Sequence, residues 1–453
     1  MSTTLHDPRP DVRPRARSAV AIPGAAAWAL VLFALAVSVR VAALGLPALA
    51  ESNYEEAEAG LMTRHLLQSE FVAIWWGQPY PGTLHIYLAA PLFWLLSPTT
   101  VVLRLAPLGL SLVATLVSYL FARDLFGPRW ALLTLGWWVV PPAFLTRLSL
   151  TPYTYIGSVA WGTVVLYLTH RVVSRGAPRK PGWFLIGFFS GLALWDHLIS
   201  LCYVATAALW LALDRFREAR RPLRAGWVRR LVAQPVWGLG LAGVFVGSAP
   251  LWSWNAMHRF ETFTEMVQPG VASGHAILGH LELIFGDFAI DILGRAKHFW
   301  IDLSGERVLT ALILLVYGPM LAYYLSHFAT RAWRSWREAA RPVGGSPPGL
   351  ALVFVSFLLA CAQVVFSSYE KALYLMPLYS SVPLLLTGYA RALSRASRWL
   401  VVLVSAGVLA IHAADTAKLY QASHSVRHNP RPVDAAINFL DRQAIRHVYA
   451  HHR

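Results

Sequence analysis

The first long apolar stretch of the chain reads AAAWALVLFALAVSVRVAALGL at residues 25–46. About 20 consecutive apolar residues suffice to cross the hydrocarbon core of a bilayer as an α-helix. This stretch therefore predicts a membrane-spanning helix, and the same pattern recurs along the rest of the chain. We expect further spans at residues 101–122, 129–146, 153–173, 182–197, 198–213, 233–251, 308–326, 349–367, 373–390 and 399–414.

The composition also indicates a membrane protein. Hydrophobic residues make up 56% of the 453 residues and charged residues only 14%, against about 25% charged residues in a typical soluble domain. We therefore expect an all-α polytopic membrane protein, a bundle of about 11 transmembrane helices whose main partner is the lipid bilayer.

The net charge of +16 does not indicate a nucleic-acid partner. Nucleic-acid binding needs a contiguous basic face, whereas the basic residues here form short blocks between apolar segments, as cytoplasmic loops do. With the N-terminus in the cytoplasm, eleven crossings place every block inside and the C-terminus outside. We expect a multi-pass protein of the cell (inner) membrane. The blocks are Arg9 to Arg17, Arg123 to Arg129, Arg171 to Lys180, Arg215 to Arg230, Arg331 to Arg341 and Arg391 to Arg398.

This topology divides the chain into three parts. A basic cytoplasmic N-terminus at residues 1–24 precedes a membrane domain at 25–414, and an external tail follows at 415–453. Two long external loops, 47–82 and 252–307, belong to the membrane domain. The tail has the pattern of one helix and one strand, half of an α/β unit, so we expect a truncated C-terminal domain.

Residues 83–97 need a separate interpretation. The segment is apolar, but it is short and contains Pro91. A full crossing here would invert the side of every later basic block. We therefore expect an interfacial or re-entrant helix. In the preceding loop, residues 54–69 have the pattern of a helix that lies along the membrane surface.

A group of carboxylates, Glu55-Glu56-Ala57-Glu58, begins this surface helix in a chain with only 23 Asp and Glu residues. Acidic groups at a bilayer surface are candidates for chemistry on a lipid-linked substrate. A structural interpretation competes, because Ser52 and Glu55 have the spacing of a capping box. The two interpretations are compatible, since a carboxylate at a helix N-terminus stays ionised and can serve as a general base.

A series of short motifs follows in order along the chain. They are Tyr54–Ala57, Gly60–Leu67, Trp76–Leu84, Tyr87–Leu92, Leu103–Pro107, Phe121–Gly127 and Tyr374–Tyr379. Together they resemble the GT-C membrane glycosyltransferases, and the first three resemble the first external loop of these enzymes. The nearest groups are the protein O-mannosyltransferases, the lipid A aminoarabinose transferases and the rhizobial galacturonosyltransferases. The resemblance covers most of residues 25–414.

The resemblance implies a donor sugar on a polyprenyl phosphate, transferred outside the membrane to an unknown acceptor with inversion at the anomeric carbon. By position, Glu55 replaces the usual Asp of these enzymes and Glu56 corresponds to their following Glu, so both are candidate catalytic residues. The candidate substrate-binding residues are Arg64, His65, Tyr80, His85 and Lys371.

Each of these binding residues also has a structural interpretation. Arg64 can extend toward lipid headgroups, His85 can be a satisfied interfacial histidine, and Lys371 can pair with Glu370. For Asp196 and His197, at the end of a predicted span, we expect a helix-turn cap, with a site role as the alternative.

We expect neither a cofactor nor a metal site. The His and acidic residues of the long external loop match no standard ligand spacing. They are His275, His280, Glu282, Asp287 and Asp291.

Three departures from the resemblance keep other functions open. Glu55 is one methylene longer than Asp, His85 stands where relatives often carry an acidic residue, and residues 147–156 lack an acidic group. A displacement of about 1 Å at a reacting group can cost about a hundredfold in rate. The alternatives are an inactive GT-C-like partner subunit and a transporter or flippase of lipid-linked sugars.

Overall fold

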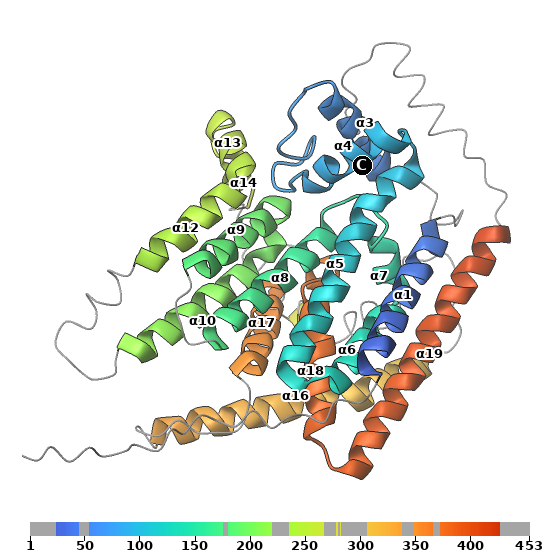
Figure 1. Cartoon of the computed structure of the whole chain (residues 1–453), viewed down its shortest axis with the longest axis vertical. Helices are drawn as coiled ribbons and strands as arrows, with labels where there is room; N and C mark the ends of the chain where they lie inside the picture. Colours follow the sequence, from blue (N-terminus) through green and yellow to red (C-terminus); the bar gives the residue numbers. More distant parts are fainter. Residues whose placement is uncertain are drawn as a thin grey trace, which may run out of the picture.

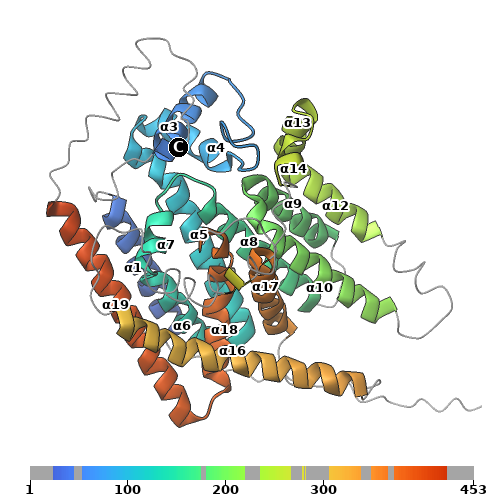
Figure 2. The same cartoon turned by 180° about the vertical axis from the view of Figure 1, so that it is seen from behind.

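The computed structural model describes residues 24–44, 54–174, 180–219, 235–266, 278–279, 281, 306–337, 348–365 and 372–425. The regular elements in these ranges are helices (Figures 1 and 2). They are α1 (Ala25–Leu44), α3 (Tyr54–Leu67), α4 (Leu84–Leu96), α5 (Thr100–Phe126), α6 (Pro128–Val139), α7 (Ala143–Leu148), α8 (Tyr155–Ser174), α9 (Lys180–Asp196), η1 (Leu198–Ser200), α10 (Leu201–Ala219), α12 (Pro235–Gly247), α13 (Ala249–Met257), α14 (Glu261–Met266), α16 (Glu306–Arg337), α17 (Pro348–Val365), η3 (Ala372–Leu375), α18 (Leu378–Ala392) and α19 (Arg395–Ser425).

The all-α fold class is confirmed, and every predicted span coincides with helix. Three predicted spans are broken. The segment 373–390 divides into η3 and α18 at Met376 and Pro377. The segment 129–146 divides into α6 and α7 at Pro141 and Pro142, because proline lacks the backbone donor that a continuous helix needs. The segment 233–251 divides into α12 and α13, whose axes differ by 65°, and Pro250 lies in the first turn of the second helix.

The number of crossings stays a prediction. Five helices of the described residues are long and apolar enough to span a membrane, or six if α12 and α13 form one bent span. The helix α4 has 13 residues and contains Pro91. At about 1.5 Å per residue it is too short to cross a hydrocarbon core of about 30 Å. Its length therefore agrees with an interfacial or re-entrant helix.

The largest buried core lies among α5, α6, α8, α17 and α18. A second core joins α3 to α4 and to the start of α5, with Ala59 and Met62 of α3 fully buried. The surface helix predicted at 54–69 is therefore present as α3, and it packs on the bundle through its apolar side.

Helices α9 and α12 pack closely through glycines. A Cβ atom at Gly243 would lie 2.3 Å from the carbonyl oxygen of Phe184, and one at Gly247 would lie 2.0 Å from that of Phe188. On the facing helix, a Cβ at Gly187 would lie 2.0 Å from the carbonyl oxygen of Gly240. Small residues at four-residue spacing let helix backbones approach in this way.

The bundle has two chemically different ends. At one end Arg171 pairs with Asp124 at 2.8 Å, and Arg391 donates to the carbonyl oxygen of Leu125. At the other end lie α3, α4, α13 and α14, as both views show (Figures 1 and 2). Helix α5 connects the two ends, and its residues Arg104 and Asp124 are about 30 Å apart along the helix axis at about 1.5 Å per residue.

The C-terminal helix continues past residue 414, where we place the start of the external tail, and ends at Ser425. The predicted tail helix and strand at 432–450 lie outside the described residues. So do Ser52, Lys371 and the histidines and carboxylates of the long external loop. The expectations that rest on them, including the capping box, stay predictions.

Candidate functional site

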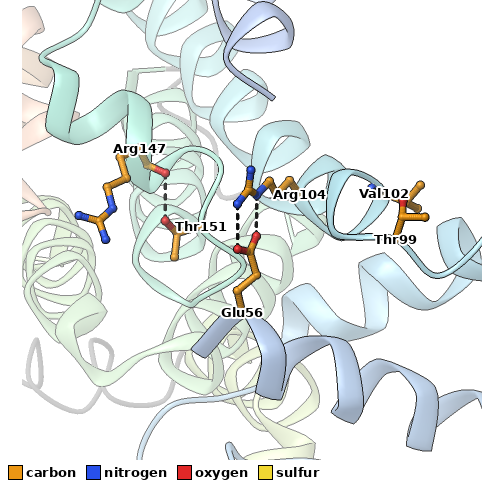
Figure 3. A network of polar contacts seen from close by, with 6 residues as sticks. All are labelled: Glu56, Thr99, Val102, Arg104, Arg147 and Thr151. Atoms are coloured by element: carbon orange, nitrogen blue, oxygen red, sulfur yellow. Dashed lines mark hydrogen bonds and ion pairs between the residues drawn. The ribbon is translucent and has the colours of Figure 1, made fainter. Parts of the chain in front are cut away.

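Glu56, in the first turn of α3, is held by Arg104 of α5. The carboxylate accepts from Nε of Arg104 at 2.5 Å and from Nη2 at 2.8 Å (Figure 3). Both side chains are buried, with 5% and 2% of their surface exposed. Burial raises the pKa of Glu56, while Arg104 and then Arg147 act in the opposite direction. The two parallel, charge-assisted hydrogen bonds fix α3 against α5.

The two other carboxylates of the acidic cluster, Glu55 and Glu58, are less buried than Glu56. Glu55 is partly exposed. Glu58 is also partly buried, and its carboxylate accepts a hydrogen bond from the indole Nε1 of Trp75 at 2.7 Å. Burial, with a smaller contribution from the charge of Glu55, raises the pKa of Glu58 to about 7, although the Trp75 hydrogen bond opposes this shift.

The first external loop is attached to the end of α9. The amide of Gly82 donates to the carbonyl oxygen of Asp196 at 2.9 Å, and the indole of Trp195 donates to that of Ala73 at 2.7 Å. Pro81 forms an isolated β-bridge with His197. A Cβ atom at Gly82 would lie 2.0 Å from the carbonyl oxygen of Trp195, so only glycine fits this contact without a shift of the backbone.

Four tyrosines gather beside this attachment, and we call Tyr80, Tyr153, Tyr155 and Tyr374 the tyrosine cluster. The Tyr153 ring lies 4.9 Å from that of Tyr155, measured between centroids, and its hydroxyl donates to Gln78 at 2.8 Å. Burial raises the pKa of Tyr153 well above its usual range, and Tyr155, Tyr80, Glu55 and Tyr374 add to the shift. Glu55 is therefore an electrostatic neighbour of the tyrosine cluster.

His197 joins the cluster from the end of α9. Its ring centroid lies 5.7 Å from that of Tyr80, 5.5 Å from that of Tyr155 and 6.2 Å from that of Tyr374. Its Nδ1 accepts from the amide of Ile199 at 3.0 Å, so the helix-turn cap expected there is present at η1. The site thus combines residues from the first loop, residues 153–155, the end of α9 and η3.

The other predicted site residues are distributed unevenly. Tyr80 is part of the tyrosine cluster, and the charge of Glu55 acts on it. His85 is buried and stacks on Trp75, with ring centroids 5.4 Å apart. Arg64 and His65 lie in the last turn of α3, where His65 pairs with Glu70 at 2.6 Å. None of these positions tests a substrate contact, so the binding roles stay predictions.

Five residues of the site are not predicted as site residues from the sequence: Arg104, Tyr153, Tyr155, Tyr374 and Gln78. One signal is present, because Arg104 is a charged residue inside a long apolar segment, and such residues usually have a buried partner. The tyrosines carry no comparable signal. Aromatic residues are common at both membrane surfaces, where they serve as interfacial anchors.

Comparison with known proteins identifies the fold. No protein-family model and no curated protein sequence matches the chain. Among solved structures, ArnT from Cupriavidus metallidurans in the apo state matches 84% of the chain, with a TM-score of 0.56 and 16% identity. The chain spans 62% of the length of that protein.

Two further structures agree. ArnT bound to undecaprenyl phosphate matches 93% of this chain and 73% of its own, with a TM-score of 0.54 and 15% identity. The Archaeoglobus fulgidus oligosaccharyltransferase, in a complex with Zn and sulfate, matches 93% of this chain and 57% of its own, with a TM-score of 0.52 and 13% identity. Both proteins are GT-C glycosyltransferases. The chain therefore has the fold of the GT-C membrane glycosyltransferases.

Proposed function

We propose that this protein transfers a sugar from a polyprenyl-phosphate-linked donor to an acceptor at the external face of the membrane, with inversion at the anomeric carbon. One observation carries the proposal. In a GT-C-like bundle, a partly exposed carboxylate, Glu55, lies close enough to the tyrosine cluster for its charge to raise the pKa of Tyr153, at the end of the bundle away from the Asp124–Arg171 pair. The ArnT structure that contains undecaprenyl phosphate supports this class of carrier.

In the proposed reaction, Glu55 is the general base. An acceptor hydroxyl or amine attacks the anomeric carbon and transfers its proton to the Glu55 carboxylate. The bond between this carbon and the phosphate oxygen breaks, and the phosphate leaves on its lipid. A cation stabilises the charge that develops on the phosphate. Arg64 and Lys371 are candidates for this contact. Arg147 of α7 joins them because its charge acts to lower the pKa of Glu56, the residue that follows Glu55 in the sequence.

Glu56 has a different role in this proposal. The residue is 5% exposed, and both of its carboxylate oxygens accept from Arg104. We assign it as a positioning residue, which fixes the first turn of α3 and thereby the place of Glu55. A one-turn displacement of α3 would separate Glu55 from the tyrosine cluster.

The distribution of charge supports the external location. Arg171 and Arg391 lie with Asp124 and Leu125 at one end of the bundle. Tyr155 of the tyrosine cluster begins α8, whose last turn carries Arg171, so the cluster lies at the other end. Because cytoplasmic loops carry the excess of Lys and Arg, the basic end faces the cytoplasm and the site faces outward. This orientation gives a multi-pass protein of the inner membrane with a cytoplasmic N-terminus and an external C-terminus.

A second candidate is a GT-C-like partner subunit without activity, which the longer carboxylate at position 55 favours. A transfer assay separates the two. The full-length protein in nanodiscs is incubated with radiolabelled undecaprenyl-phosphate glucose, mannose or aminoarabinose and a membrane extract as the source of acceptors. Sugar transfer by wild type identifies an enzyme, and binding of a donor without turnover identifies an inactive subunit.

Variants then test the base. Glu55→Gln should lower transfer at least about a hundredfold, since removal of a general base costs about 10²–10⁴ in rate. The matched control is Asp124→Asn, the same change from carboxylate to amide in the exposed ion pair at the opposite end, which should retain wild-type activity. Full activity in Glu55→Gln would remove Glu55 from the mechanism.

A further inference from the structure

His197 has one ring nitrogen whose function the fold does not explain. The side chain is 2% exposed, and its Nδ1 accepts the amide hydrogen of Ile199. A neutral imidazole that accepts at Nδ1 carries its proton on Nε2. In the part of the chain that the structure describes, this buried Nε2 has no hydrogen-bond partner. A buried donor without an acceptor is costly, which favours a ligand oxygen in its place.

The surroundings of His197 specify what such a ligand is. The rings of Tyr80, Tyr155 and Tyr374 pack on the imidazole, two of them edge-on. All three tyrosines are partly exposed, so the rings that contact the buried imidazole also reach the surface of the protein. A ligand that reaches the imidazole must therefore displace one of these rings, such as that of Tyr80 on the first loop.

The chemistry around His197 favours a sugar over a phosphate. Sugars offer hydroxyl oxygens to an N–H donor and C–H faces to aromatic rings, and sites of this kind combine apolar walls with a few placed polar groups. The neighbouring Asp196 is fully buried, and among the described residues neither of its carboxyl oxygens has a hydrogen-bond partner. This carboxyl group disfavours an anion beside His197. The rings that pack on His197 carry no positive charge that would compensate for it.

We propose that His197 binds the sugar of the lipid-linked donor, with its Nε2–H donating to a sugar hydroxyl oxygen and a ring of the tyrosine cluster packing on the sugar. The proposal rests on the proposed function and extends it, because it separates a sugar subsite at His197 from the contacts to the phosphate. His197 then has two functions: Nδ1 caps η1, and Nε2 binds substrate.

Two substitutions separate these functions. In His197→Asn the amide oxygen occupies the place of Nδ1, so the variant can keep the cap at Ile199 but has no group at the place of Nε2. In His197→Gln the longer side chain brings an amide N–H to the place of Nε2 but loses the short cap. If His197 is purely structural, His197→Asn should perform better than His197→Gln in every assay. If His197 binds the sugar, His197→Gln should bind the donor more tightly than His197→Asn.

The experiment uses the full-length protein in nanodiscs and measures its thermal unfolding and its affinity for undecaprenyl phosphate, alone or carrying glucose, mannose or aminoarabinose. For at least one sugar, wild type should bind the loaded lipid more tightly than the bare lipid. His197→Asn should keep the wild-type unfolding temperature and the affinity for the bare lipid, and lose about tenfold in affinity for the loaded lipid, as expected for one hydrogen bond. His197→Gln should unfold at a lower temperature but bind the loaded lipid within about threefold of wild type.

Three results would overturn the proposal: equal affinity of His197→Asn and wild type for the loaded lipid, an equal loss for bare and loaded lipid, or no preference of wild type for any loaded lipid. The first two leave the proposed function intact, since wild type still binds the donor. Failure of wild type to bind either form of the lipid contradicts the proposed function itself.

Discussion

Replacing Glu56 with Gln tests the positioning role of this residue. The change is nearly isosteric, but it leaves the guanidinium of Arg104, which is 2% exposed, without its carboxylate partner. Breaking a buried ion pair by removing one member costs about 3–5 kcal/mol, because the remaining charge stays buried. At about 1.4 kcal/mol per tenfold change, this loss corresponds to at least about a hundredfold in the equilibrium for local opening.

Hydrogen exchange measures this loss where it occurs. The amides of α3 in Glu56→Gln should exchange at least about a hundredfold faster than in wild type, because local opening limits their protection. The matched control is Glu55→Gln, the same change at the adjacent but partly exposed carboxylate. It should alter the stability of α3 by less than about 0.5 kcal/mol, even though it abolishes activity.

A double substitution tests whether the loss of stability in Glu56→Gln arises from the unpaired buried charge of Arg104. Replacing both members, Glu56→Met with Arg104→Met, removes both buried charges and should destabilise α3 less than either single substitution, since apolar pairs can replace buried ion pairs at little cost. Unchanged exchange in Glu56→Gln, or additive losses in the double variant, would refute the view that this pair fixes α3.

Three further predictions concern the surface helix, the glycine contacts and the loop. The folded-state pKa of Glu58, about 7, lies above its ordinary value of 4.5, so the protonated form is favoured in the folded state. The stability of α3 should therefore fall as pH rises from about 4.5 to 7; hydrogen exchange, corrected for intrinsic rates, should show this in wild type but not in Glu58→Gln. Gly243→Ala should lower the unfolding temperature, because overpacking costs about 1–3 kcal/mol. Gly238→Ala on the same helix should leave it unchanged, because a Cβ there has open space around it. Equal effects of the two substitutions would contradict the close packing of α9 and α12. Gly82→Ala should lower sugar transfer and speed proteolysis of the first loop, because its Cβ would lie 2.0 Å from the Trp195 carbonyl oxygen; wild-type values for both would contradict the attachment of this loop.

The sequence predicts the helices well because their apolar runs are long. It does not predict the breaks equally well, although Pro141-Pro142 and Pro250 are visible signals. The number of crossings is harder, because length and apolarity qualify only five or six helices of the described residues as spans. Short helices such as α9 and α18 depend on their neighbours for burial, and a single sequence does not show that packing.

The candidate site is only partly predictable from the sequence. The acidic cluster and its helix are visible as a local pattern, and so is the cap at His197. The partner of Glu56 is 48 positions away in the sequence, and the tyrosine cluster joins residues that extend from Tyr80 to Tyr374. Contacts of this kind arise from helix packing, so one sequence without tertiary information cannot place them.

The close contact between α9 and α12 does have a signal in the sequence. Gly187 and Gly191 on α9, and Gly243 and Gly247 on α12, each have the four-residue spacing that is typical of closely packed membrane helices. Such a spacing on two neighbouring apolar segments favours their pairing. It does not by itself exclude other partners, because any helix with a matching stripe of small residues could pack there.

The central claim is that a lipid-linked donor binds where α3 meets the tyrosine cluster. The most direct test is an experimental structure of the full-length protein in nanodiscs with undecaprenyl phosphate. We predict density for the phosphate at the end of the bundle that carries α3 and α4, within reach of Arg64 or Arg147 and next to the sugar subsite at His197. Phosphate density at the opposite end, near Arg171 and Arg391, would contradict this claim.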